Sequence, residues 1–259
     1  AYKVASIEAG RRITYERVTD YWAADLPVNR GQNNFNTIRY DTYLDMEVQR
    51  QAFLAGEYMI RSEHSSRDWN TAYDTPAVQR GDIQKEFMPD HLPTGMQAYV
   101  MNIRNPLFAD RRVRRALQYG LDFQWLNRAM FYGAYSRTDS YFANSDLAAK
   151  GVPTGDELAL LEPYRDQLPP ELFTEPYHQP DFDAPNGRRE ALREAMTMLN
   201  EAGWEVRDKV LVNKETGQPF RFELIIRQPG LEKIALVMKS RLKQLGVQMD
   251  IRLIDTGQW

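Results

Sequence analysis

The first part of the chain carries apolar positions that recur with the period of β-strands. Residues 2–8 and 12–18 are rich in β-branched and aromatic side chains and are separated by a turn at Gly10, which predicts a β-hairpin. A turn cluster at residues 29–34 precedes residues 35–43, whose imperfect alternation predicts a third strand. The chain therefore opens with a β-rich region.

Mixed helix and strand follow this region. Residues 45–54 predict a helix, and residues 58–61 predict a short strand that completes a β-α-β step. Residues 65–81 predict short helices interrupted at Pro76, and residues 97–103 predict another strand. Together these patterns indicate an α/β protein with mixed sheets.

The centre of the chain predicts two helices and then a long irregular stretch. Residues 111–121 place Val113, Ala116 and Leu117 at helical spacing, and Asp122 can cap the helix that follows. Residues 132–187 are rich in proline, glycine and aspartate and have little periodicity. Such a stretch in a compact protein is usually functional or wrapped over a surface.

Regular structure returns near the end of the chain. Residues 188–202 predict an amphipathic helix, and residues 220–226 alternate as a strand. Residues 231–245 carry one apolar face and end at Gly246, and residues 247–253 alternate again. The last three segments predict a right-handed β-α-β crossover with parallel strands.

Composition narrows the chemistry. The net charge of −3 gives no electrostatic footprint for nucleic acid, so we expect no nucleic-acid partner. Cysteine is absent and the three histidines lie far apart, so we expect neither disulfides nor a metal site. Phosphate-binding glycine loops and hydrolase motifs are also absent, and we expect no cofactor and no enzymatic activity. A carboxylate-dependent glycoside hydrolase stays open as an alternative, because sequence does not show how far apart two acids lie.

Five arginines lie close together in the chain, at positions 104, 111, 112, 114 and 115. One interpretation is a basic patch for an anionic ligand. The other is the solvated face of the helix at residues 111–121. We favour the second because the net charge is negative and Asp110 lies directly before the helix.

Aromatic and polar residues alternate in the irregular stretch. Tyr132, Tyr135, Tyr141 and Phe142 are interleaved with Arg137 and other polar residues, which suits adaptable recognition of a peptide or a sugar. Ordinary packing is the alternative for any single aromatic residue. We take Tyr135, Arg137 and Tyr141 as candidate ligand-binding residues.

A second candidate segment follows the short strand predicted at residues 58–61. Ligands in open α/β sheets lie beyond the carboxyl ends of strands. Glu63 can neutralise a peptide amino terminus there, and Arg61 or Arg67 a carboxylate. The alternative is a solvated turn in which Ser65 or Ser66 caps the next helix. Arg61, Glu63, His64 and Ser65 are the candidates here.

One segment resembles a known family. Residues 102–133, NIRNPLFADRRVRRALQYGLDFQWLNRAMFYG, are similar to the family 5 extracellular solute-binding proteins, which bind oligopeptides, dipeptides or nickel for ABC importers. Four further segments occur in the order of that family: ITYERVTDYW, AFLAGEYMIRSE, AMTMLNEAGW and ALVMKSRLKQLGVQMDI. Around SSRDWNTAYD and SRTDSYF the sequence looks closest to the Yej-type peptide-binding branch.

The resemblance implies a class II periplasmic-binding-protein-like α/β fold with parts of two lobes. We expect residues 1–98 to form part of lobe I and residues 99–259 part of the second ligand-binding lobe, with the strand at residues 97–103 crossing between them. No signal segment precedes the first strand, and both ends fall at strands. We therefore expect a portion of a longer, periplasmic protein.

The resemblance also implies a function. Members of the family close two lobes around a ligand and deliver it to an ABC permease in the inner membrane. We expect a monomer that binds peptides without catalysis, with Arg61–Ser65 and residues 135–142 facing the cleft. The alternative on the same scaffold is an oligosaccharide or a metal chelate as ligand.

Overall fold

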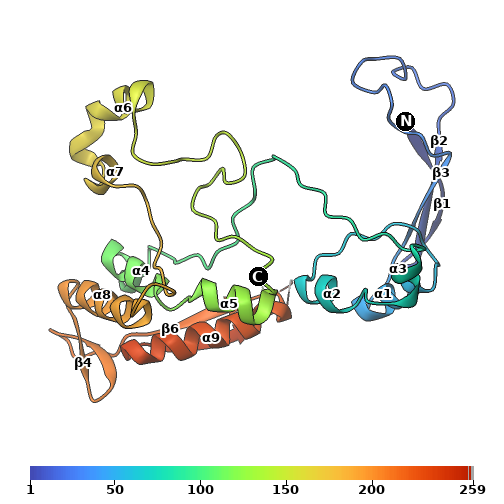
Figure 1. The fold of residues 1–259 in the computed structure, drawn as a ribbon. Coiled ribbons are helices and arrows are strands. Elements are labelled where there is room, and N and C mark those ends of the chain that lie inside the picture. Colours follow the sequence, from blue (N-terminus) through green and yellow to red (C-terminus); the bar gives the residue numbers. More distant parts are fainter. Residues whose placement is uncertain (256, 258–259) are drawn as a thin grey trace. The chain divides into compact units, whose positions relative to one another are not determined.

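The structure is a computed structural model that describes residues 1–255 and residue 257 (Figure 1). Contacts divide the chain into two compact units. Unit 1 comprises residues 1–65 and 74–84, and unit 2 comprises residues 66–73 and 85–259. The lobe boundary between residues 98 and 99 stays a prediction.

Unit 1 begins with an antiparallel sheet of three strands in the order β1-β2-β3. The strands are β1 (Tyr2–Glu8), β2 (Arg12–Arg17) and β3 (Thr37–Asp41), which confirms the predicted hairpin and the third strand. Arg12 lies opposite Asp41, and its Nε donates to Asp41 Oδ1 at 2.6 Å. This hydrogen bond lowers the pKa of the Asp41 carboxyl below its usual value.

Short helices follow the sheet. In α1 (Met46–Leu54) the Asp45 side chain accepts a hydrogen bond from the Val48 backbone, so this helix is capped as predicted. Pro76 is the first residue of α3 (Pro76–Arg80), where a missing N–H costs nothing. It therefore begins a helix and does not interrupt one. The helix α2 (Ser66–Thr71) belongs to unit 2.

Two predicted strands are wrong. Residues 58–61 and 97–103 pair with no strand in the part of the chain that the structure describes. Several of their apolar side chains are exposed, with Ile60 at 79% and Val100 at 91%. Alternation of apolar residues indicates a strand only where a neighbouring strand completes the hydrogen-bond ladder, and here that ladder is missing. The β-α-β step around α1 is therefore also wrong.

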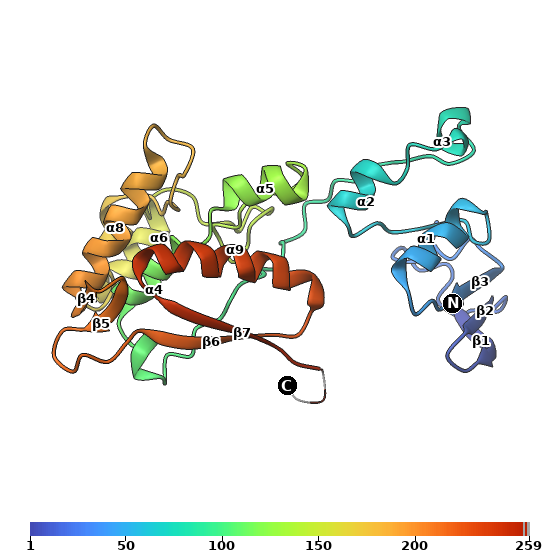
Figure 2. The same ribbon diagram turned by 90° about the horizontal axis from the view of Figure 1, so that it is seen from below.

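Unit 2 is built on a parallel strand pair with a helix along it (Figure 2). The strands are β6 (Arg221–Ile226) and β7 (Gln248–Leu253), and the helix between them is α9 (Glu232–Leu242). The parallel pairing is as predicted. Gly246 ends the intervening segment with φ of +80°, a conformation that favours glycine.

Two more helices complete this core. They are α4 (Arg111–Gln118) and α8 (Gly187–Glu201), both close to their predicted bounds. The close approach of α4 to α9 requires Gly120, because a Cβ there would lie 2.6 Å from Leu242 Cδ2. The buried cluster is apolar and comes from α4, α8, α9, β7 and segments beside them: Phe108, Val113, Ala116, Leu117, Ala195, Leu199, Leu211, Phe220, Ala235, Met238, Leu242, Leu245, Val247 and Met249.

A hairpin that was not predicted lies between α8 and β6. Its strands are β4 (Trp204–Arg207) and β5 (Val210–Asn213), and Trp204 packs edge-on against Phe220 with ring centroids 4.6 Å apart. The hairpin thus covers one end of the core.

The remaining helices are short. Asp122 caps α5 (Phe123–Phe131) as predicted, by accepting from the Trp125 backbone at 3.0 Å. Residues 132–187 are not irregular throughout, because they contain α6 (Gly155–Leu161) and α7 (Glu171–Thr174). Four 3-10 turns lie at Pro106–Phe108, Glu162–Gln167, Pro229–Leu231 and Lys243–Leu245. Among the described residues, no helix has the length and apolar character needed to cross a bilayer.

Candidate functional site

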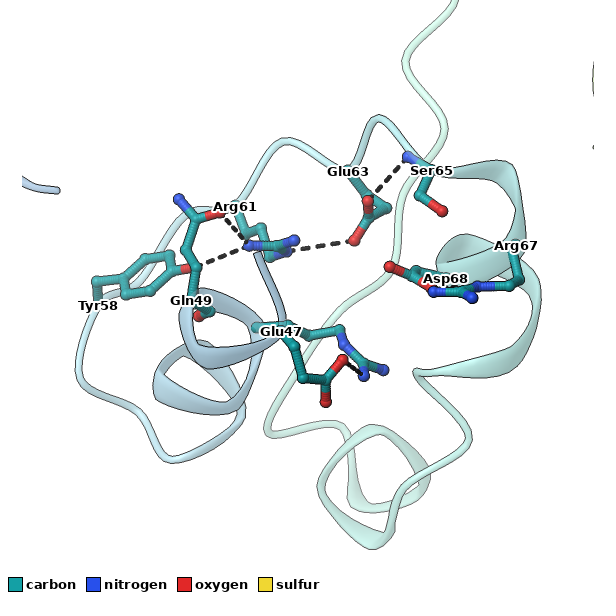
Figure 3. A network of polar contacts seen from close by, with 9 residues as sticks. Glu47, Gln49, Tyr58, Arg61, Glu63, Ser65, Arg67 and Asp68 are labelled. Carbon is teal, nitrogen blue, oxygen red and sulfur yellow. Dashed lines mark hydrogen bonds and ion pairs between the residues drawn. The ribbon is translucent and has the colours of Figure 1, made fainter. Parts of the chain in front are cut away.

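The first candidate segment, in unit 1, is held by a buried ion pair (Figure 3). Arg61 Nε donates to Glu63 Oε2 at 3.2 Å, and the two side chains are only 4% and 3% exposed. On its other side Arg61 Nη1 donates to Gln49 Oε1 at 2.8 Å and to the Tyr58 hydroxyl at 3.2 Å. The helix α1 and the segment after it thus fix the guanidinium.

Glu63 also orders the backbone that follows it. Its Oε1 accepts a hydrogen bond from the Ser65 backbone N–H at 2.9 Å, so both carboxylate oxygens have partners (Figure 3). Breaking a buried ion pair by removing one partner is costly, because the other charge is left unpaired. The pair therefore holds residues 61–65 in one conformation, and His64 lies exposed between its anchored neighbours.

The structure places the candidate residues of the second segment, in unit 2, in different surroundings. The Tyr135 backbone is held at both ends by Asn127, whose Oδ1 accepts from Tyr135 N and whose Nδ2 donates to Tyr135 O. Its ring packs edge-on against Phe131 at 5.2 Å. Tyr141 is 81% exposed. Neither tyrosine lines the pocket that contains Arg137.

Arg137 lines a pocket of about 310 Å³ within unit 2. One wall comes from the start of α5, with Phe123 and Gln124, and the other from the segment Tyr177, His178, Gln179 and Pro180; Asp139 completes the lining. The walls are fixed by hydrogen bonds between segments far apart in sequence, among them Gln179 Nε2 to the Thr138 carbonyl at 2.6 Å.

The Arg137 guanidinium is desolvated. Its Nη1 is buried and has no hydrogen-bond partner, and burial lowers the pKa of Arg137 from its usual value. The Oε1 atoms of Gln124 and Gln179 are likewise buried without a partner. Buried polar groups normally find partners, so three such atoms in residues around one pocket indicate a site completed by something else.

The sequence did not single out Tyr177, His178, Gln179 or Gln124. They lie about forty residues from Arg137 or on the preceding helix, and only the fold brings them together. A weak signal was present, since Tyr177–Gln179 is bracketed by prolines at 176 and 180, an arrangement that favours a fixed extended segment.

The arginine cluster of α4 behaves as a solvated helix face. Arg112 pairs with Asp110 at 2.6 Å, Arg115 with Glu171 at 3.3 Å, and Arg114 donates to the carbonyls of Phe108 and Ala109. Their partners are the helix's own N-terminal turn and α7. In the described part of the chain, no three His, Asp or Glu side chains converge as they would around a metal ion.

Comparison with known proteins identifies the family. The profile described as bacterial extracellular solute-binding proteins, family 5 middle, matches residues 1–259. The probable peptide-binding protein YejA of Agrobacterium fabrum is 43% identical over 260 residues, and the peptidoglycan-binding protein YepA of the same organism is 37% identical. Both alignments cover 100% of this chain, but only 42% and 43% of the relatives. The chain thus spans about two fifths of the length of these relatives.

Solved structures show the same fold. NikA from Brucella suis in complex with Fe(III)-EDTA matches with a TM-score of 0.65 at 19% identity, over 99% of this chain and 43% of that one. The oligopeptide-binding protein AppA from Bacillus subtilis, in complex with a nonapeptide, matches with a TM-score of 0.56 at 21% identity, over 99% and 42%. The mixed α/β architecture is therefore part of the two-lobed binding-protein fold, as predicted. The chain belongs to family 5 of the bacterial extracellular solute-binding proteins.

Proposed function

We propose that the protein captures peptides outside the inner membrane and delivers them unchanged to the permease of an ABC importer. The observation that carries this proposal is the match of the whole chain, at 43% identity, to a relative named as a probable peptide-binding protein. Because the identity to that relative extends over the whole chain, we expect the ligand class to be shared as well.

The two candidate segments offer the groups that a peptide needs. Residues 61–65 present the exposed His64 side chain on a loop fixed by the Arg61–Glu63 pair. Around Arg137 a cation, amide oxygens and aromatic rings surround one pocket. We propose that Arg61, Glu63, His64, Ser65, Tyr135, Arg137 and Tyr141 serve ligand binding, with Arg61 and Glu63 acting by holding the loop.

Ligand class can be tested with thermal unfolding of the full-length protein in the presence of single compounds. The panel contains tri- to nonapeptides, a peptidoglycan-derived peptide, maltooligosaccharides and Fe(III)-EDTA. We expect a rise in melting temperature with peptides alone, because a ligand that binds only the folded state stabilises it. A rise with a sugar or with the chelate, and none with any peptide, would contradict the proposal.

A further inference from the structure

We infer that the pocket around Arg137 receives a carboxylate of the ligand together with the N–H group next to it, as at the carboxyl end of a peptide. The inference rests on the proposed function and names the part of a peptide that unit 2 recognises.

The first support is the unpaired cation. Arg137 Nη1 is buried without a hydrogen-bond partner, in a residue that lines a pocket of about 310 Å³. An arginine loses hydration when it is buried and recovers that energy only by pairing. A planar carboxylate matches the guanidinium in geometry as well as in charge.

The second support is the orientation of two amides in the same lining. Gln179 Nε2 donates to the Thr138 carbonyl at 2.6 Å, and Gln124 Nε2 donates to Asp181 Oδ1 at 3.3 Å. Both partners are acceptors, so they fix the nitrogen of each amide and leave its oxygen without a partner. The residues that line this pocket thus hold two acceptor oxygens and one cationic group without partners. A ligand that pairs with all of them carries both an anionic group and an N–H donor.

This combination distinguishes between ligand classes. A phosphate dianion would satisfy the arginine, but it has no N–H donor for the two amide oxygens. A sugar hydroxyl could donate to the amides and accept from the arginine, but it carries no charge to neutralise the buried cation. A carboxylate with a neighbouring peptide N–H satisfies both, and Phe123 and Tyr177 supply apolar surface for the adjoining chain.

The direct test uses a small probe with only these groups. N-acetylglycine has one carboxylate and one adjacent amide N–H, and N-acetylglycinamide has the same shape without the charge. Titration of the full-length protein, with the Arg137 side-chain Nε–Hε signal followed by NMR, should give a saturable shift with the acid. We expect binding of the amide to be weaker by about tenfold. No shift with the acid, or equal shifts with both compounds, would overturn the inference.

A second test uses peptides and matched variants. Calorimetry should show that C-terminal amidation weakens peptide binding by about tenfold in the unmodified protein, and that Arg137→Gln weakens binding of the acid while removing this difference. Arg189→Gln is the control. Arg189 is exposed on α8, so its substitution removes the same charge away from the pocket. Equal binding of acid and amide by the unmodified protein, a comparison that needs no variant, would also overturn the inference.

The two proposals fail in different ways. If peptides bind but neither amidation nor Arg137→Gln matters, the inference fails and peptide capture stands. If no peptide binds, the proposed function fails, and the response of Arg137 to N-acetylglycine still decides whether its pocket takes a carboxylate.

Discussion

At the scale of single residues, Asp122 joins three elements of unit 2. Its side chain is 1% exposed, and it caps α5 while its Oδ2 lies 3.2 Å from Arg188 Nε on α8 and 3.3 Å from Arg241 Nη2 on α9. The cap was predicted from sequence, because an aspartate directly before an apolar period is a local signal. The two arginines were not, since they follow 66 and 119 residues later in the chain.

Asp122→Ala removes the cap and the buried partner of both arginines. We expect a loss of about 2–4 kcal/mol in the free energy of unfolding, and about half of that for Asp122→Asn, which can still cap the helix. Chemical denaturation measures both. Asp45→Asn, at the exposed cap of α1, is the control and should change stability by less than about 0.5 kcal/mol. If Asp122→Asn and Asp45→Asn lowered the free energy of unfolding equally, the pairs of Asp122 with the two arginines would contribute nothing to stability.

Glu63 is the residue whose role the structure changes most. From sequence it was a candidate partner for a peptide amino terminus, yet both of its carboxylate oxygens have partners within its own loop. Nothing in the spacing of residues 61–65 predicts this pairing, because side chains two apart can lie on the same or on opposite sides of an irregular segment. Its contribution to binding is therefore expected to be positional.

Glu63→Ala should weaken peptide binding in the full-length protein by about tenfold, because it removes the carboxylate that pairs with the buried Arg61 and that accepts from the Ser65 backbone N–H. Glu63→Gln keeps acceptor oxygen and shape and should retain most of the affinity. Calorimetry with free and N-acetylated forms of one peptide separates the roles. A loss on acetylation that disappears in Glu63→Gln would instead establish direct contact with the amino terminus.

At the scale of elements, sequence predicted well for the longer segments that bury a regular apolar face in the core of unit 2. The helix α9 and strand β7 illustrate this, since their periods of 3.6 and 2 reflect contact with the same core. The strands expected at residues 58–61 and 97–103 show the limit, because alternation does not reveal whether a pairing strand is available.

The missed hairpin has a different cause. The turn between β4 and β5 consists of Asp208 and Lys209, both with positive φ, at +50° and +66°. Two-residue hairpin turns usually carry glycine or asparagine in this conformation, and the pair Asp-Lys gives no such signal. The backbone accepts the strain because Leu211 is fully buried in the core.

The hairpin also depends on Gly246. With φ of +80°, a Cβ at this position would lie 2.6 Å from the Leu211 backbone nitrogen. Gly246→Ala should therefore destabilise the protein by about 1–3 kcal/mol, through both the conformation and the clash. Gly230→Ala is the control, because its Cβ would meet nothing within 4 Å and its φ is not positive. An equal change of the melting temperature in both variants would contradict this packing.

At the scale of the whole molecule, family membership could be recognised from sequence because five motifs occur in the family's order. The ligand site could not be predicted in the same way. Arg137 was a candidate, but its pocket is completed by Gln124 and by residues 177–180, which converge only through the fold. The chain also spans about two fifths of the length of its relatives.

The proposed function requires that the protein holds a peptide and leaves it chemically intact. The most direct test is calorimetric titration of the full-length protein with one peptide. The peptide is then recovered from the sample cell of the calorimeter and analysed by mass spectrometry. We predict saturable binding and full recovery of the unaltered peptide. Recovery of cleaved peptide, or no heat of binding with any peptide that raises the melting temperature, would contradict it.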